Sequence, residues 1–258
     1  MTRRIELLAP AGDVDCARAA IVGGADAIYC GLSKFNARNR ATNLTLEELD
    51  EVVRLAHCHA CKVFLTLNVI FAESELPELI RWLNRLCNAR LDGIIVQDLG
   101  LLYLLEKHFP ELSAHASTQL TTHNAGQIRF LGGLSVTRAN LCRELSLEEI
   151  RAVTSVGHDV GIQTEVFVHG SYCISFSGLC YMSSVLAGRS GNRGRCSQPC
   201  RDRYLPTPAG REYPLNLKDN SAYFDAKALA DAGVDAVKLT FSFSETALME
   251  VVLAGEGV

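Results

Sequence analysis

The stretch Gly24-Ala25-Asp26-Ala27-Ile28 ends a helical pattern at a glycine, turns through a short polar residue and enters an apolar run. Glycine ends a helix at little steric cost, and the polar residue turns the chain before a buried strand. Three later stretches repeat this device: Leu91-Asp92-Gly93-Ile94-Ile95, Gly133-Leu134-Ser135-Val136 and Gly233-Val234-Asp235-Ala236-Val237. The repeat predicts a chain in which helices and strands alternate.

Eight short apolar runs rich in branched residues alternate with longer amphipathic stretches. The runs cover residues 5–9, 27–31, 62–68, 93–98, 112–117, 138–142, 163–169 and 236–240. This count predicts the α/β class and a TIM-type (β/α)8 barrel. A ninth run at 213–218 leaves open whether the barrel is complete or modified. An open doubly wound sheet is the alternative architecture.

Two of the helical stretches begin with a capping box. Thr45 is followed three residues later by Glu48, and Ser146 by Glu149. In such a box, each side chain satisfies a backbone N–H group in the first helical turn. The boxes therefore predict helices after the second and sixth strands.

Composition narrows the class of protein. The chain has 258 residues, of which 48% are hydrophobic and 21% charged, and its formal net charge is −4. The length and composition are typical of one large globular domain, which we expect over 1–258. The negative net charge means that the surface as a whole does not have the positive charge of a nucleic-acid-binding protein. The first residues resemble neither a signal peptide nor a membrane span, and ten cysteines without a secretion signal indicate a reducing compartment. We expect a cytoplasmic protein with no membrane partner.

Polar side chains follow several of the predicted strands. In a barrel, the carboxyl ends of the strands form the active-site face. The residues at these ends are Asn68, Gln97, Asp98, His115, Ser117, Gln119, Arg143, Glu144, Glu165 and His169. Each one alone is more often a helix cap or a loop hydrogen-bonding group, but together they predict a polar pocket.

Four cysteines follow the seventh strand within a segment rich in Gly, Ser and Arg. Cys173, Cys180, Cys196 and Cys200 have the spacing C-x6-C-x15-C-x3-C. We expect a metal-binding insertion at 171–212 that lies over the mouth of the barrel. Thiolates bind both iron–sulfur clusters and zinc, and the wide first spacing favours iron–sulfur over zinc.

The same segment carries Arg189 and Arg193, which together with Arg143 could grip a carboxylate through paired hydrogen bonds. A solvated arginine face is the alternative interpretation.

At these residues the sequence resembles peptidase family U32, the collagenase-like peptidases. The stretch EVFVHGSYCISFSGLCYMS at 165–183 is similar to the family signature, with Tyr172 where the family has an aliphatic residue. GRSGNRGRC at 188–196, QPCR at 198–201, ELLAPAG at 6–12 and TLN at 66–68 are also family-like. The resemblance spans nearly the whole chain.

The resemblance implies a 4Fe-4S cluster on the four cysteines and oxygen-independent hydroxylation. In one branch of the family the products are 5-hydroxyuridine in tRNA or 5-hydroxycytidine in 23S rRNA, with prephenate as the oxygen donor. In another branch a protein with a partner subunit hydroxylates the ubiquinone ring. The QPCR and GRSGNRG stretches are closer to the RNA branch, so we expect an RNA-modifying enzyme.

Two departures from the family pattern bear on the substrate. Members commonly end their last strand with Lys-Ile-Glu-Gly-Arg, whereas this chain has Lys238-Leu239-Thr240-Phe241-Ser242. The chain ends at Val258, before the carboxy-terminal extension of many members. Three expectations follow: weaker RNA binding, RNA binding supplied by a partner, or a different substrate.

Under this hypothesis Glu165, His169 and Arg143 are the catalytic residues, and Asn68, Gln119, Arg189 and Arg193 bind substrate. Three alternatives remain. The first is the hydroxylation of a quinone precursor ring together with a partner subunit. A peptidase would need an activated nucleophile, and the sequence has no HExxH or GxSxG motif. A non-catalytic iron–sulfur scaffold would leave the polar pocket without a role.

Overall fold

The computed structural model describes residues 5–37, 42–171, 173–201, 203–204, 213–214, 220–222 and 224–240. Its first half alternates strands with helices. In chain order the elements are β1 (Glu6–Pro10), α1 (Val14–Val22), β2 (Ala27–Gly31), α2 (Leu46–Cys58), β3 (Lys62–Leu67), the 3-10 helix η1 (Glu73–Glu75), α3 (Leu76–Leu86), β4 (Gly93–Val96), α4 (Leu99–His108), β5 (Ala114–Ala116), the 3-10 helix η2 (Thr118–Leu120) and α5 (Ala125–Gly132).

The second half continues the alternation and adds an extension. Its elements are β6 (Val136–Asn140), α6 (Leu147–Asp159), β7 (Gln163–Ser171), α7 (Met182–Ala187), the 3-10 helices η3 (Gly191–Arg193) and η4 (Pro199–Arg201), β8 (Arg203–Tyr204), β9 (Tyr213–Pro214), β10 (Asn220–Ala222), α8 (Ala226–Asp231) and β11 (Ala236–Leu239).

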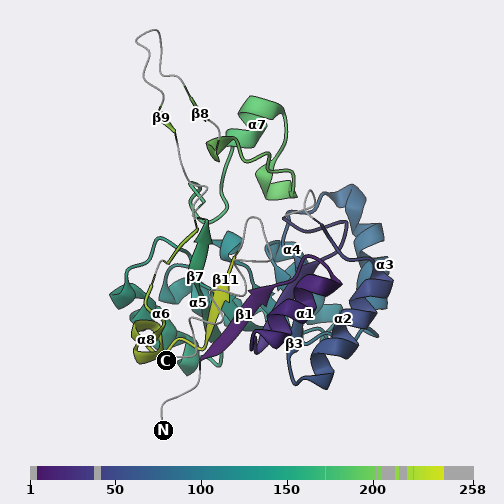
Figure 1. Ribbon diagram of the computed structural model, residues 1–258, viewed down its shortest axis with the longest axis horizontal. Coiled ribbons are helices and arrows are strands. Elements are labelled where there is room, and N and C mark those ends of the chain that lie inside the picture. Colours follow the sequence, from purple (N-terminus) through teal and green to yellow (C-terminus); the bar gives the residue numbers. More distant parts are fainter. Residues whose placement is uncertain are drawn as a thin grey trace.

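Eight parallel strands close into a barrel. Their order around it is β1, β2, β3, β4, β5, β6, β7 and β11, and β11 pairs in turn with β1. The helices surround the strands, and the carboxyl ends of β7 and β11 point toward the extension that carries α7 (Figure 1). The predicted TIM barrel is confirmed, and each of the eight predicted runs overlaps one of its strands. The alternative of an open sheet is wrong because β6 pairs with β7.

The ninth predicted run does not enter the barrel. Its described part, Tyr213–Pro214, pairs antiparallel with β8 in a separate two-stranded sheet, and residues 215–218 lie outside the described residues. β10 adds to β7 in the antiparallel direction.

The repeated turn before the strands has a structural cause. Asp26, Asp92 and Asp235 each precede a strand, and each carboxylate accepts a hydrogen bond from a backbone N–H group of the preceding barrel strand. The donors are Leu7 at 2.9 Å, Val63 at 2.8 Å and Thr164 at 2.7 Å. Each aspartate therefore fixes the amino-terminal end of one strand pair. The two capping boxes at Thr45 and Ser146 are also formed, as predicted.

The outer face of the strands packs against the helices in one large apolar core. A second, smaller cluster consists of Leu8, Ala27, Phe64 and Ile95. Along β1 to β4 these residues alternate with those of the large core, so their side chains point to the other face of the strands, into the barrel. On β6, β7 and β11 the corresponding inward positions carry charged and amide side chains instead. This division makes one side of the barrel interior polar.

Candidate functional site

Glu165 is the centre of a buried polar network inside the barrel. Its Oε1 atom accepts hydrogen bonds from Asn140 Nδ2 at 2.6 Å and Lys238 Nζ at 3.0 Å. Arg138 Nη1 lies 3.6 Å from Oε2. The side chains of Glu165, Arg138 and Lys238 are between 2% and 5% exposed. A charge this deeply buried requires ion pairing, and the strands on either side of β7, β6 and β11, supply the partners.

Glu6 extends this network toward the amino-terminal end of the barrel. Its carboxylate pairs with Arg138 at 2.5 Å and with Lys62 at 2.7 Å. Burial raises the pKa of Glu6, but hydrogen bonds and charge from Arg138 and Lys62 outweigh burial and hold the pKa below its ordinary value. Arg138 thus joins two carboxylates.

Several buried oxygen acceptors in the carboxyl half of the barrel have no hydrogen-bond donor among the described residues. They are Gln97 Oε1, Gln119 Oε1, Asn140 Oδ1 and Glu165 Oε2. Buried acceptors of this kind are usually satisfied by water or a ligand. A substrate that offers N–H groups is therefore chemically suited to this face.

The cysteine-bearing extension, defined here as residues 173–201, is attached to the barrel at two places. Near its start, Ser177 donates from its N and Oγ atoms to Glu144 at 2.9 and 2.6 Å, in the loop after β6. Further on, Ile70 N, in the loop after β3, donates to the Asn192 carbonyl at 3.1 Å. Because β3 and β6 lie three strands apart around the barrel, the extension passes over its carboxyl end.

Two residues of the candidate site contact this extension. Gly178 has a φ of +104°, and a Cβ atom there would lie 2.6 Å from Gln119 Cγ, so Gly178 is needed for the close approach. Arg143 lies against Cys173. Burial raises the pKa of the Cys173 thiol, but hydrogen bonds from Ser175 and the charge and hydrogen bond of Arg143 outweigh it, so the pKa is below its ordinary value.

The cysteines of the extension have some of the properties of metal ligands. The lowered pKa of the Cys173 thiol increases its share of thiolate, the form that binds iron or zinc. A Cβ on Gly191 would lie 3.7 Å from Cys196 Cβ and 4.0 Å from the Cys180 carbonyl oxygen. The donor set therefore suits a thiolate-bound cluster by its chemistry. Among the described residues, however, no three His, Cys, Asp or Glu side chains converge as metal ligands. The cluster on Cys173, Cys180, Cys196 and Cys200 stays a prediction.

His169 lies near the end of β7, where its carbonyl accepts a hydrogen bond from Thr240 N at 3.0 Å. Burial lowers the pKa of its imidazole, so the ring is neutral at physiological pH and can give or take a proton. The next residue of the strand, Gly170, must lack a side chain, because a Cβ there would overlap Thr240. Gly170, part of the family-like stretch, therefore lets β7 and β11 meet.

The remaining predicted residues have structural contacts. Asn68 Oδ1 accepts from Ala37 N at 3.0 Å, and Arg193 Nη2 pairs with Glu75 at 2.7 Å, which anchors the extension. Asp98 caps α4. Arg189 follows α7 and is exposed on the extension. The structure thus brings Glu165 together with Asn140 and Lys238. Arg143 contacts Cys173, and Gln119 contacts Gly178. Arg193 and Asn68 lie apart from these groups, in contacts between loops.

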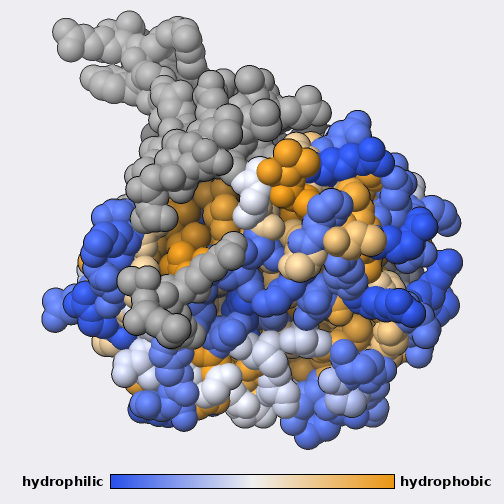
Figure 2. All heavy atoms as spheres, turned by 60° about the horizontal axis from the view of Figure 1, so that its bottom comes forward, coloured by the Kyte–Doolittle hydropathy of each residue, from blue (hydrophilic) through white to orange (hydrophobic). Residues whose placement is uncertain are grey.

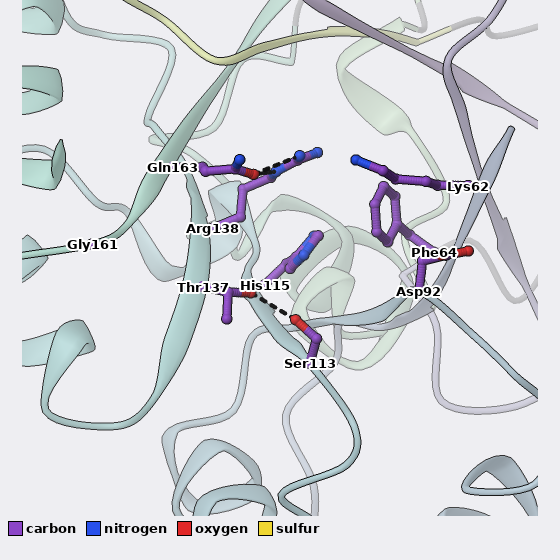
Figure 3. Close-up of a pocket in the computed structure, with 9 residues that line it drawn as sticks. All are labelled: Lys62, Phe64, Asp92, Ser113, His115, Thr137, Arg138, Gly161 and Gln163. Atoms are coloured by element: carbon purple, nitrogen blue, oxygen red, sulfur yellow. Dashed lines mark hydrogen bonds between the residues drawn. The ribbon is translucent and has the colours of Figure 1, made fainter. Parts of the chain in front are cut away.

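His115 is not at the carboxyl face as expected. It lies within β5, its ring packs 4.5 Å from that of Phe64, and it lines a hollow of about 380 Å³ at the opposite, amino-terminal end. Figure 3 shows its ring beside Arg138 and Gln163. The polar groups of this hollow largely satisfy one another, since Gln163 Oε1 accepts twice from Arg138 and Ser113 bonds Thr137. With this end turned forward, Figure 2 shows hydrophilic side chains around apolar recesses.

Sequence reasoning missed Lys238, Asn140 and Arg138 as site residues. Each stands within a predicted strand, and a lysine or arginine in an otherwise apolar run was the available signal. Such a charged residue belongs to the site only if its side chain faces into the barrel, and only the strand register establishes that.

These features define a (β/α)8 barrel with a buried carboxylate–lysine–amide group toward its carboxyl end and a cysteine-rich extension across its mouth. Residues 12–252 match the model of peptidase family U32, and the chain belongs to that family.

The chain is 39% identical over 260 residues to the 23S rRNA 5-hydroxycytidine synthase of Escherichia coli K12, a match that covers 98% of this chain and 39% of that protein. It is 32% identical to the tRNA hydroxylation protein P1 of Bacillus subtilis, over 93% of this chain and 59% of that one. The chain thus spans only part of these relatives.

The solved structure of the U32 peptidase Mk0906 is similar with a TM-score of 0.66, 13% identity and 95% coverage of both chains, which supports the fold. None of the helices in the described residues has the length and hydropathy of a membrane span.

Proposed function

We propose that this protein is an enzyme of RNA modification that hydroxylates a pyrimidine at C5 in tRNA or rRNA. The observation that carries the proposal is the 39% identity to a 23S rRNA 5-hydroxycytidine synthase across 98% of the chain. A second relative, a tRNA hydroxylation protein, supports the same chemistry on a different RNA.

The geometry of the site suits a nucleobase. The buried acceptors Gln97 Oε1, Asn140 Oδ1 and Glu165 Oε2 can take hydrogen bonds from the amino group of cytosine or the N3–H group of uracil. Lys238 holds Glu165 in place from the opposite side of the carboxylate. His169, neutral because burial lowers its pKa, can accept the proton that leaves the ring carbon.

The reaction replaces C5–H by C5–OH, a two-electron oxidation of the ring. The proposed oxygen donor is a small carboxylate such as prephenate, which supplies the oxygen atom and takes up the two electrons. In this proposal Arg143 and the exposed Arg189 bind its carboxylates through paired hydrogen bonds.

The proposed cofactor is a 4Fe-4S cluster on Cys173, Cys180, Cys196 and Cys200, with zinc as the less favoured alternative. A cluster there would supply electron transfer or a Lewis-acid iron beside the mouth of the barrel. The hydrogen bonds of Ser175 and the charge of Arg143, which lower the pKa of the Cys173 thiol, support thiolate ligation. Anaerobic purification with iron and sulfide assays tests this: about four irons per chain are expected for such a cluster, and colourless protein with stoichiometric zinc would contradict it.

The function itself is tested by mass spectrometry of nucleosides. Transfer RNA and ribosomal RNA are purified separately from a deletion strain and from the strain carrying the wild-type gene. We expect one 5-hydroxypyrimidine to disappear from one of the two RNA classes and to return with the gene. Unchanged levels in both classes would remove the proposal. If the reaction requires a partner subunit, the gene will restore the modified nucleoside in cells, but the purified chain alone will not form it.

A further inference from the structure

Near the start of the extension, polar side chains are buried and apolar side chains are exposed to solvent. Ser175 and Ser177 are buried, at 8% and 0% exposure, whereas Ile174, Phe176 and Leu179 beside them are 46% to 51% exposed. The buried serines are held by hydrogen bonds: Ser175 Oγ accepts from Gly178 N at 3.0 Å, and Ser177 Oγ donates to Glu144. These bonds turn the apolar side chains toward solvent.

The exposed apolar side chains continue along the extension. Tyr181 is 75% exposed, Val185 80% and Leu186 56%. We call the set the rim surface; its members are Ile174, Phe176, Leu179, Tyr181, Val185 and Leu186. Exposed apolar groups scattered singly need no explanation, but such a concentration within thirteen consecutive residues indicates a binding surface.

The charge of the extension has one sign. Residues 173–201 contain Arg189, Arg193, Arg195 and Arg201 and no aspartate, glutamate or lysine. Arg193 pairs with Glu75, while Arg189 and Arg195 are exposed. Positive charge beside exposed aromatic rings is the combination that binds unpaired nucleic acid, because arginines contact phosphates and rings stack on bases.

The rim surface also borders the barrel mouth. The ring centroid of Phe176 lies 6.3 Å from that of His123, in the loop after η2, and Gly178 touches Gln119. A pyrimidine must leave its stack to enter the barrel, and an aromatic ring at the entrance can replace the stacking that its neighbours lose.

We propose that the rim surface binds a single-stranded segment of RNA, with bases flanking the target stacked on Phe176 and Tyr181 and their phosphates contacted by Arg189 and Arg195. The inference rests on the proposed function for its choice of RNA. A purely apolar protein partner would not require the uniform positive charge.

The test is binding of the full chain to fluorescently labelled, pyrimidine-rich single-stranded RNA, measured by anisotropy at several salt concentrations. Phe176→Ala and Tyr181→Ala are each expected to weaken binding roughly 5- to 150-fold, the range for loss of one stacked base. Arg195→Ala should lower the slope of log affinity against log salt by about 0.7. Tyr103→Ala and Phe130→Ala, which remove rings 57% and 55% exposed on α4 and α5, are matched controls expected to bind as wild type.

Equal affinity of wild type, Phe176→Ala and Tyr181→Ala, or no RNA binding by the wild type, would overturn the inference. If Phe176→Ala and Tyr181→Ala abolished self-association or the binding of another protein while RNA affinity stayed unchanged, the rim surface would be a protein-binding surface and the inference would be overturned. The readout is independent of catalysis, so rim variants that lose RNA binding would support the inference even if the nucleoside analysis removed the hydroxylase proposal.

Discussion

At the scale of single residues, Glu165 depends on its partners. Its carboxylate is 2% exposed and takes hydrogen bonds from Lys238 and Asn140. Lys238 also stands 4.3 Å from the centroid of the Tyr29 ring, a cation–π contact that helps to keep the ammonium group in the barrel. The pair is therefore a fixed charge arrangement rather than a mobile surface bridge.

Replacing Lys238 should show this dependence. Lys238→Met leaves a buried carboxylate without its nearest ammonium group, and we expect the free energy of unfolding to fall by about 3 kcal/mol. Urea denaturation measures the change. Lys227→Met, which breaks an exposed i,i+4 pair with Asp231, is the control and should change stability by less than ~0.5 kcal/mol. Equal stability of the two variants would contradict a charged interior.

His115 gives a prediction on pH. Burial, and then the positive charges of Arg138 and Lys238, lower the pKa of its imidazole well below the ordinary value. The folded protein therefore keeps His115 neutral while the unfolded chain takes up a proton below about pH 6.5. Its contribution to stability is full above that pH and is lost as the pH falls, by up to about 1.4 kcal/mol per pH unit.

Urea unfolding of the wild type and of His115→Phe, from pH 7.5 to 5.0, checks this contribution. The phenylalanine variant should lose stability less steeply than the wild type as the pH is lowered. Parallel curves would show that His115 takes up its proton in the folded protein.

At the residue level, the sequence could single out a side chain that belonged to a motif, but not one whose position depended on strand register. Glu165 follows from the family-like stretch, and the structure places it in the barrel interior. Asn140 and Lys238 were recognised only as strand residues, because the sequence does not show which face of β6 or β11 turns inward. His115 was predicted at the carboxyl end of its strand, but it is the middle residue of the short strand β5 (Ala114–Ala116). The carboxyl end of β5 leads instead to Ser117, which caps η2.

At the scale of elements, the aspartates before the strands are a repeated stabilising device. Asp235 accepts from Thr164 N at 2.7 Å and from His158 Nε2 at 3.0 Å, and its side chain is 3% exposed. It connects the start of β11, the last strand of the barrel, to the neighbouring strand β7.

Asp235→Ala should therefore lower the free energy of unfolding by roughly 2–3 kcal/mol, since a buried N–H group loses a charged acceptor. Asp231→Ala, four residues earlier on the exposed face of α8, should change it by less than ~0.5 kcal/mol. Thermal or urea denaturation compares the two. A small effect at Asp235 would mean that backbone pairing alone holds β7 and β11 together.

Elements were the most predictable level of this structure. Short branched runs between glycine turns give barrel strands because a strand buried on both faces is continuously apolar, and the capping boxes mark two helix starts. The extension was predicted only as a cysteine segment over the mouth. Its attachment through Ser177 to Glu144 and through Asn192 to the loop after β3 depends on contacts between distant residues that have no local sequence pattern.

At the scale of the whole molecule, the barrel and the extension are in direct contact. Arg143, in the loop after β6, contacts Cys173 of the extension, and Glu144 beside it accepts two hydrogen bonds from Ser177. A scaffold that only bound iron would not need the polar interior of the barrel, whereas an enzyme for an anionic donor and a nucleobase would.

The most direct test of this account is the 5-hydroxypyrimidine content of RNA from deletion strains that express Glu165→Gln or Arg143→Ala. Both variants are first checked for wild-type abundance and iron content, and two positions are used because Glu165 is buried. The account predicts that wild type restores the modified nucleoside and that each folded variant leaves it at least 100-fold lower, the scale expected when a positioned proton-transfer or charge-binding group is lost. Full restoration by both variants would place the chemistry outside this barrel site.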